Sequence, residues 1–451
     1  MQNSHLYELT SDLKDKILND PILKSKKDVQ NISAVCRAFK EIKNVPKWHI
    51  REDSPIDIFM RAAQRKCTEL NFNQCNLSEI TVPVSLPPSL KRLVLDYFTI
   101  NTPTTLINKA LTSEIEELFL HCDLDGITVP NSLSPSLKHL DLESSKNMPV
   151  ELITKALVSG LKSLNFSNLR ACDLAGIEVP NSLPSSLKEL WTSFGENIPV
   201  ELITKALESD LEQLCLTGYN TEGVTVPNSL SPRLKFLSVA SSAFLDHLIT
   251  KALASNIEDL DCSCCDLGEI TVPESLSSSL KELDLSVSGR VPANLITKVF
   301  ESCVETFSLY DCEIDGIIGP VSLPPSLKKL YLGKADNISS DLITKALASD
   351  LEVLNLHSCD LTGTDVPDVL SVDLKKLILG RAKNIPLELL NVALSSSTIE
   401  ELSLRYCDLA EISVPESLPA SLTELDLTGA KNIPPELITK AKALPHCYVK
   451  T

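Results

Sequence analysis

Leucines recur along residues 67–434 in a pattern that repeats every 46 to 50 residues. Each of the eight units holds two short runs in which apolar and polar residues alternate, as in Leu354-Asn355-Leu356. Alternation with a period of two predicts a β-strand with one buried face. The sixteen expected strands centre on residues 70, 93, 118, 140, 164, 190, 214, 237, 260, 283, 307, 330, 354, 377, 402 and 425, all leucines except Phe307.

The segments that follow the two kinds of strand differ. After the Ser-Leu-Lys strands comes a stretch such as N-I-P-V-E-L-I-T-K-A-L, in which Pro199 suits a helix start and Leu202, Ile203, Ala206 and Leu207 fall on one helical face. After the other strands comes I-T-V-P-x-S-L-P-P-S-L, whose prolines exclude a regular helix. We therefore expect helical and non-helical connectors to alternate.

The strands and the turns after them resemble the leucine-rich repeat, Leu-x-x-Leu-x-Leu-x-x-Asn/Cys-x-Leu, over roughly residues 67–451. The resemblance implies an α/β solenoid, a horseshoe of about 16 parallel strands lining its concave face. It also implies buried cysteines in the C-D-L turns, at Cys75, Cys122, Cys172, Cys265, Cys312, Cys359 and Cys407. One repeat cannot bury its leucine face alone, so stacking supplies the core.

The second position of most strand runs is charged. Lys stands at 91, 138, 188, 235, 281, 328 and 375, and Glu stands at 116, 212, 258, 305, 352 and 400. Neighbouring strands lie about 4.8 Å apart, so the two charges should alternate along one edge of the sheet. A charged binding track is one interpretation, but the regularity favours a self-neutralising ladder that fixes the repeat register.

Residues that break the pattern are better candidates for binding a partner. Aromatic and basic side chains fall at or near outward strand positions, at Phe119, Trp191, Tyr219, Tyr310, Tyr331, His357, Arg405 and Tyr406. Tyrosine, tryptophan and arginine dominate interface hot spots, so we expect these residues to hold a protein on the concave face. The alternative is that the rings pack on neighbouring side chains of the same sheet.

The N-terminal segment carries a second resemblance. Its apolar residues at helical spacing and the run V-C-R-A-F resemble an F-box, with Thr10 in place of the usual proline and Phe39 where tryptophan is common. The resemblance implies that a Skp-type adaptor of a cullin ubiquitin ligase contacts Leu9, Leu13, Ile17, Leu18, Val29, Val35, Cys36, Arg37 and Phe39. The alternative is a helical cap that shields the first repeat.

These patterns divide the chain into four parts. We expect a helical F-box-like module at 5–45, a linker and N-terminal cap at 46–66, the solenoid at 67–434 and a C-terminal cap at 435–451. The run I-D-I-F-M-R-A-A-Q-R-K-C within the second part is helical in pattern.

Composition excludes some classes of function. The net charge is −18, which disfavours a general nucleic-acid binder. No apolar run reaches the ~20 residues of a membrane span, and the N-terminus has no signal-peptide core, so the fourteen cysteines favour reduced thiols in a cytosol. Signature motifs of nucleotide-binding and hydrolytic enzymes are absent, and Cys262, Cys264 and Cys265 lack a further convergent metal ligand.

The combined expectation is a substrate receptor of an SCF-type ubiquitin ligase, with no enzymatic activity, cofactor or metal of its own. The architecture of an F-box followed by leucine-rich repeats is typical of such receptors. It would act in the cytoplasm or nucleus, or in a host cytoplasm if the chain is a eukaryote-like effector of an intracellular bacterium. The alternative is a leucine-rich-repeat scaffold or sequestering protein with no link to ubiquitin.

Overall fold

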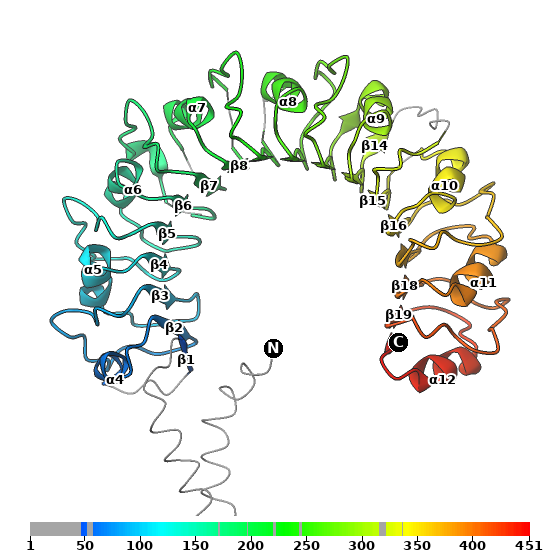
Figure 1. The fold of residues 1–451 in the computed structure, drawn as a ribbon, viewed down its shortest axis with the longest axis horizontal. Coiled ribbons are helices and arrows are strands. Elements are labelled where there is room, and N and C mark those ends of the chain that lie inside the picture. The colour runs from blue at the N-terminus through cyan, green and yellow to red at the C-terminus, as the bar shows by residue number, and fades with distance from the viewer. Residues whose placement is uncertain are drawn as a thin grey trace, which may run out of the picture.

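The computed structural model describes residues 47–51 and 57–451, apart from 170–171, 196, 220–221, 243–245, 315–321 and 336; for 47–51 it describes the backbone only. The F-box-like module expected at 5–45 lies outside these residues. The described chain forms an arch with strands along its inner arc and helices along its outer arc (Figure 1). This is the horseshoe of a leucine-rich-repeat solenoid, as the sequence predicts.

One parallel sheet of 18 strands lines the inner arc, and each strand pairs with its neighbours in chain order. The strands are β1 Lys47–Arg51, β2 Glu69–Asn73, β3 Arg92–Leu95, β4 Glu117–Leu120, β5 His139–Asp141, β6 Ser163–Asn165, β7 Glu189–Ser193, β8 Gln213–Thr217, β9 Phe236–Ser238, β10 Asp259–Asp261, β11 Glu282–Asp284, β13 Thr306–Ser308, β15 Lys329–Tyr331, β16 Val353–Asn355, β17 Lys376–Ile378, β18 Glu401–Ser403, β19 Glu424–Asp426 and β20 Tyr448–Lys450. Two short strands, β12 Arg290–Val291 and β14 Glu313–Ile314, pair apart from it.

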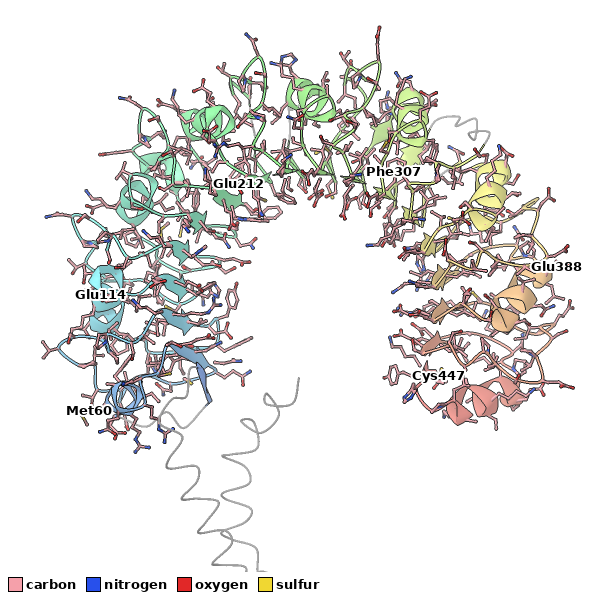
Figure 2. All side chains as sticks on the ribbon, in the orientation of Figure 1. Met60, Glu114, Glu212, Phe307, Glu388 and Cys447 are labelled. Carbon is pink, nitrogen blue, oxygen red and sulfur yellow. The ribbon has the colours of Figure 1, made fainter. Side chains whose placement is uncertain are left out.

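The sixteen expected strands are all present, and their central residues are in register with one another. Leu70 pairs with Leu93, Leu93 with Leu118, and so on to Leu425, with Phe307 taking its place in β13. Figure 2 shows Phe307 on the inner arc. Every one of these side chains is at most 2% exposed. Burial of about 1.5–3 kcal/mol per leucine, repeated along the arch, makes this row the centre of the core.

Two strands were not expected. β1 places Trp48 in register with Leu70, and β20 places Val449 in register with Leu425. They lie in segments where the sequence indicates a linker and caps. Their runs are short and lack the Leu-x-Leu signature, which is why the repeat pattern alone did not reveal them.

The outer arc alternates as predicted. Helices α5 Thr104–Thr112, α6 Val150–Leu157, α7 Val200–Glu208, α8 Asp246–Leu253, α9 Ala293–Phe300, α10 Ser340–Leu347, α11 Leu387–Ser395 and α12 Pro435–Ala443 follow every second repeat strand. α4 Ile58–Gln64 confirms the helical pattern expected before β2. The proline connectors contain, in their described residues, only the short 3₁₀ helix η1 Leu174–Gly176. In α7 the predicted stripe Leu202, Ile203, Ala206 and Leu207 is buried.

The turns after the strands form a second buried row. All seven predicted cysteines are buried, and several donate a hydrogen bond to the preceding strand, as Cys359 Sγ does to the Leu332 carbonyl at 3.2 Å. Four of the alternate turns use a hydroxyl, at Thr99, Ser145, Ser242 and Ser288, and Ser288 Oγ donates to the Cys262 carbonyl at 3.1 Å. Alanine takes this position at Ala335, Ala382 and Ala430. Burial raises the pKa of Cys359 to about 12, so its thiol stays protonated at neutral pH.

The aspartate of C-D-L and the asparagine of N-I-P form a clamp between repeats. Asn384 adopts a φ of 51°, a region that asparagine tolerates, and its Nδ2 donates to Asp360 Oδ1 at 2.9 Å. Hydrogen bonds from Thr362 and Asn384 lower the pKa of Asp360 to about 2. The same contact joins Asn147 to Asp123, Asn197 to Asp173, and Asn432 to Asp408.

Candidate functional site

The concave face is built from the first, third and fifth positions of each strand, because alternate side chains of a strand point away from the core. Its third row varies from strand to strand. From β2 to β19 it reads Asn71, Val94, Phe119, Asp141, Asn165, Trp191, Cys215, Ser238, Asp261, Asp284, Ser308, Tyr331, Asn355, Ile378, Ser403 and Asp426. The outer helices vary less, since Leu-Ile-Thr-Lys recurs in six of the eight from α5 to α12. Variation is therefore concentrated on the concave face.

The two halves of this face differ in charge. We call strands β2–β11 the N-terminal arm and β13–β20 the C-terminal arm. In the N-terminal arm the three outward rows hold ten carboxylates and one cation, Arg92; the carboxylates are Glu69, Asp96, Glu117, Asp141, Glu143, Glu189, Asp259, Asp261, Glu282 and Asp284. This half of the concave face is strongly acidic.

Four of these carboxylates meet where the N-terminal arm ends. Asp259 pairs in register with Glu282, and Asp261 with Asp284. Burial, followed by the charges of Glu282, Asp261 and Asp284, raises the pKa of Asp259 to about 6. Ser238 Oγ donates to Asp261 Oδ2 at 2.8 Å, but no Lys or Arg of the described chain pairs with the four.

The C-terminal arm combines cations with tyrosines. The guanidinium of Arg381 lies 4.3 Å from the ring centroid of Tyr406, and Lys334 Nζ lies 5.5 Å from that of Tyr310. His357 stacks on Tyr310 at 6.5 Å, and its pKa is lowered by burial and by the charges of Arg381, Lys334 and Arg405. Lys376 pairs with Glu401, and Lys450 Nζ lies 2.6 Å from Glu424 Oε1.

The N-terminal arm carries aromatic contacts of its own. Tyr97 stacks on His121 with ring centroids 4.5 Å apart, and His121 Nε2 lies 3.1 Å from Asp141 Oδ1. Arg92 lies 4.2 Å from the ring centroid of Phe119, and Trp191 stacks on Phe236 at 5.2 Å. Rings held in this way lose little freedom when a partner binds.

Seven of the eight expected binding residues reach this face or its rim. Phe119, Trp191, Tyr310, Tyr331 and His357 are partly buried along it, and Arg405 and Tyr406 are exposed. They do not form one cluster, because Phe119 and Trp191 belong to the N-terminal arm and the other five to the C-terminal arm. The alternative, that the rings pack on neighbouring side chains of the same sheet, also holds in part, as the stacked pairs show.

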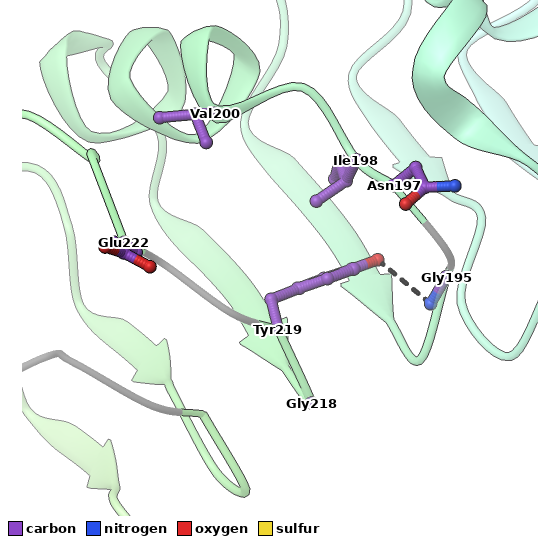
Figure 3. A pocket seen from close by; sticks show the side chains of 7 residues that line it. All are labelled: Gly195, Asn197, Ile198, Val200, Gly218, Tyr219 and Glu222. Atoms are coloured by element: carbon purple, nitrogen blue, oxygen red, sulfur yellow. Dashed lines mark hydrogen bonds between the residues drawn. The ribbon is translucent and has the colours of Figure 1, made fainter.

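Tyr219 is the exception, and its assignment as a binding residue is wrong. It is 4% exposed and occupies the turn position that cysteine fills in the other copies. Figure 3 shows its side chain extending towards Gly195, and its hydroxyl accepts a hydrogen bond from the Gly195 amide at 3.4 Å. Burial raises its pKa. The ring is part of the core and lines a hollow of about 340 Å³ beside Asn197, Ile198 and Val200.

The charged edge ladder is present in part as ion pairs. Lys91 pairs with Glu116 at 3.2 Å, Lys235 with Glu258 at 2.9 Å, and Lys281 with Glu305 at 2.9 Å. Each partner is about half exposed, so each pair adds about 0–1 kcal/mol. Their regular spacing supports a role in repeat register over one in recognition.

No group of histidines, cysteines and carboxylates in the described chain could hold a metal ion. Cys262 and Cys265 are buried as expected, and Cys264 is exposed. Among the described residues no helix is long and apolar enough to cross a membrane.

Sequence reasoning missed several residues of the face. Asp141, Asn165 and Glu189 lie between Phe119 and Trp191 across β5 to β7, and the four central carboxylates face one another. The signal was available, because aligning the sixteen strands on their central leucines places these residues in adjacent columns. The expectation covers only aromatic and basic residues at these positions, and so leaves out short polar and acidic ones.

No family model matches the sequence, and no curated protein matches it. Among solved structures, the chain is similar to the TLR13–ssRNA13 complex (TM-score 0.40, 14% identity, 89% of this chain and 66% of that one). It is also similar to the mouse RP105/MD-1 complex (0.42, 18%, 86% and 69%) and to a leucine-rich-repeat protein of Leptospira interrogans (0.31, 17%, 92% and 98%). With TM-scores below 0.5, the assignment of the leucine-rich-repeat fold depends on the repeats themselves.

The pKa of Asp259 makes a prediction about stability. Its folded pKa of about 6 exceeds the ordinary aspartate pKa of 3.8, so the folded state binds this proton more tightly than the unfolded state. Stability should fall as pH rises from about 4 to about 6 and stay lower at pH 7, by at most about 3 kcal/mol from this group. The Asp259→Asn variant should therefore melt at a higher temperature than wild type at pH 7, with the difference shrinking toward pH 4.

Circular dichroism melts at pH 4, 5, 6 and 7 measure this difference. Asp368→Asn, which removes an exposed carboxylate of a proline connector, is the matched control. An Asp259→Asn advantage that is absent at pH 7, or equal at all four pH values, contradicts the assignment.

Proposed function

We propose that this chain is a leucine-rich-repeat interaction protein that holds a protein partner on its concave face and acts by binding alone. The observation that carries the proposal is the contrast between a uniform outer arc and a variable inner one. Sixteen third-row positions with the same backbone setting hold nine different residue types. A surface that served only the fold would repeat, as the outer helices do.

The charge pattern defines the partner further. The outward rows of the N-terminal arm hold ten carboxylates and one cation, whereas those of the C-terminal arm hold four cations and three carboxylates, with Arg405 and Arg381 against Tyr406. This difference in charge between the two arms orients a partner and speeds its association. A partner with a basic end would place that end on the N-terminal arm and so contact the face in one orientation.

Photo-crosslinking tests this proposal. A benzoylphenylalanine placed at Trp191 or at Tyr331 should give a covalent adduct with a partner protein in expressing cells, and the same adduct from both sites. The probe at Val158, which is 61% exposed at the end of α6, is the convex control. Equal adducts from Val158, or none from either concave site, would contradict binding on the concave face.

A finer function is a proposal from the sequence alone. We infer that the N-terminal segment docks a Skp-type adaptor and a cullin ligase core, so that the arch presents its partner for ubiquitin transfer in a cytoplasm, including that of a host cell. The support is the V-C-R-A-F run with its apolar spacing at Leu9, Leu13 and Leu18. The proposed benefit is proximity, since tethering makes the transfer intramolecular.

Co-purification with a Skp adaptor tests the finer function. Wild-type chain should retain the adaptor, and the pair Leu18→Asp with Val35→Asp should reduce retention at least tenfold by placing charges in an apolar contact. Trp191→Ala, far along the chain, is the control and should retain it. Failure of wild type to bind leaves the chain as a scaffold without a ubiquitin link.

A further inference from the structure

A pocket lies between two aromatic rings on the N-terminal arm. Along the third row, Phe119 pairs in register with Asp141, Asp141 with Asn165, and Asn165 with Trp191. Two short polar side chains thus stand between two large rings on four successive strands, β4 to β7, which span about 14 Å. The result is a hollow of about 270 Å³, lined by Phe119, His139, Leu140, Asp141, Ser163, Asn165, Glu189 and Trp191. We call it the Phe119–Trp191 pocket.

Both rings are supported on the side away from the pocket. Arg92 on β3 lies over Phe119 at 4.2 Å, and the Phe236 ring, on β9, stacks on Trp191 at 5.2 Å with the planes 29° apart. The strand order places β3 and β9 outside the β4–β7 segment, so these contacts leave the pocket sides of the rings available. The walls of the pocket are therefore preorganised before anything enters it.

The pocket is acidic and holds no lysine or arginine. Glu189 has only neutral neighbours at its position, Ser163 on β6 and Gln213 on β8, and it forms no ion pair with a described residue. The Asp141 carboxylate adds a second negative charge and contacts His121. A cation entering here meets carboxylates and ring faces together, an arrangement that strengthens cation–π attraction.

The N-terminal arm contains a second site of aromatic ring and carboxylates, and there an arginine of the chain itself occupies it. One strand away, the Arg92 guanidinium lies against the other face of Phe119 while it pairs with Glu117 on β4 and lies 3.8 Å from Glu69 on β2. The pocket repeats the aromatic wall and the carboxylates without a guanidinium. The chain itself thus shows which group completes such a site.

We infer that the Phe119–Trp191 pocket binds an arginine side chain of the protein partner. This inference depends on the proposed function of the concave face and adds the chemistry of one contact. The planar guanidinium stacks on Trp191 and donates to the Glu189 carboxylate and the Asn165 side-chain oxygen, while Phe119 forms the opposite wall of the pocket. The volume is below the range of about 300–1,000 Å³ of small-molecule sites, and suits one side chain.

A short peptide tests the inference without the natural partner. The probe is the blocked tripeptide acetyl-Gly-Arg-Gly-amide, titrated at constant ionic strength into the full chain carrying Trp48→Phe, which leaves Trp191 as the single tryptophan reporter. Saturable change of Trp191 fluorescence is expected for the arginine peptide. The isosteric citrulline peptide, which lacks the charge, should bind at least about threefold more weakly, and the lysine peptide should also bind more weakly because it does not stack.

Paired variants locate the contact. Glu189→Gln should weaken the arginine peptide at least about threefold. Glu282→Gln, at the same strand position on β11 but outside the pocket, should leave the affinity within the error of wild type. Circular dichroism melts of both variants separate lost binding from lost folding.

Three results would overturn the inference: equal binding of the citrulline peptide, equal or tighter binding of the lysine peptide, or equal losses in the two variants. The crosslinking experiment above keeps the failures apart. If both concave sites give adducts but the pocket shows no preference for arginine, the arginine contact is wrong and the binding of a partner on the concave face still holds. If the pocket binds the arginine peptide but neither concave site gives an adduct, the pocket's preference for arginine stands and the proposed protein partner does not.

Discussion

The common register of the parallel strands is the constraint on which the rest of this structure depends. A repeat of one helix and two strands has no apolar partner for its own leucines, so each leucine column is buried only because the neighbouring strands hold it at the same level. A slip of one residue would turn every leucine outward. In the turns that follow the strands, the buried cysteines and hydroxyls and the asparagine clamps hydrogen-bond neighbouring repeats to each other, and so hold them in the same register.

This constraint also frees the concave face. Once the inward positions are committed to leucine, the outward positions of the same strands have no role in the core. Their side chains stand in columns about 4.8 Å apart, so neighbouring copies combine into surfaces that no single repeat contains. The Phe119–Trp191 pocket arises in this way, from four strands of two neighbouring repeats. The contact of Asp259 with Glu282 instead joins the two strands of one repeat.

Much of the fold could be predicted, because a period of two inside a period of about 47 leaves little freedom. The strands, the alternating connectors and the buried cysteines follow from it. The edges were harder: β1 and β20 take their register from a neighbouring strand, and nothing in K-W-H-I-R or Y-V-K alone indicates pairing. The site was harder still. Tyr219 looks like an exposed aromatic until the alignment of the repeats places it at a cysteine position. Asp141 and Asn165 contribute because their short side chains leave space between the rings of Phe119 and Trp191.

The central claim is that recognition lies in the third row of the concave face and in both arms. The most direct measurement is the affinity of a crosslink-identified partner for sixteen variants, each with one third-row residue from Asn71 to Asp426 changed to alanine. The account predicts that losses above tenfold fall in two separated groups, one around Phe119 to Trp191 and one around Tyr331, with small effects elsewhere. Equal losses along the row, or none beyond twofold, would contradict it.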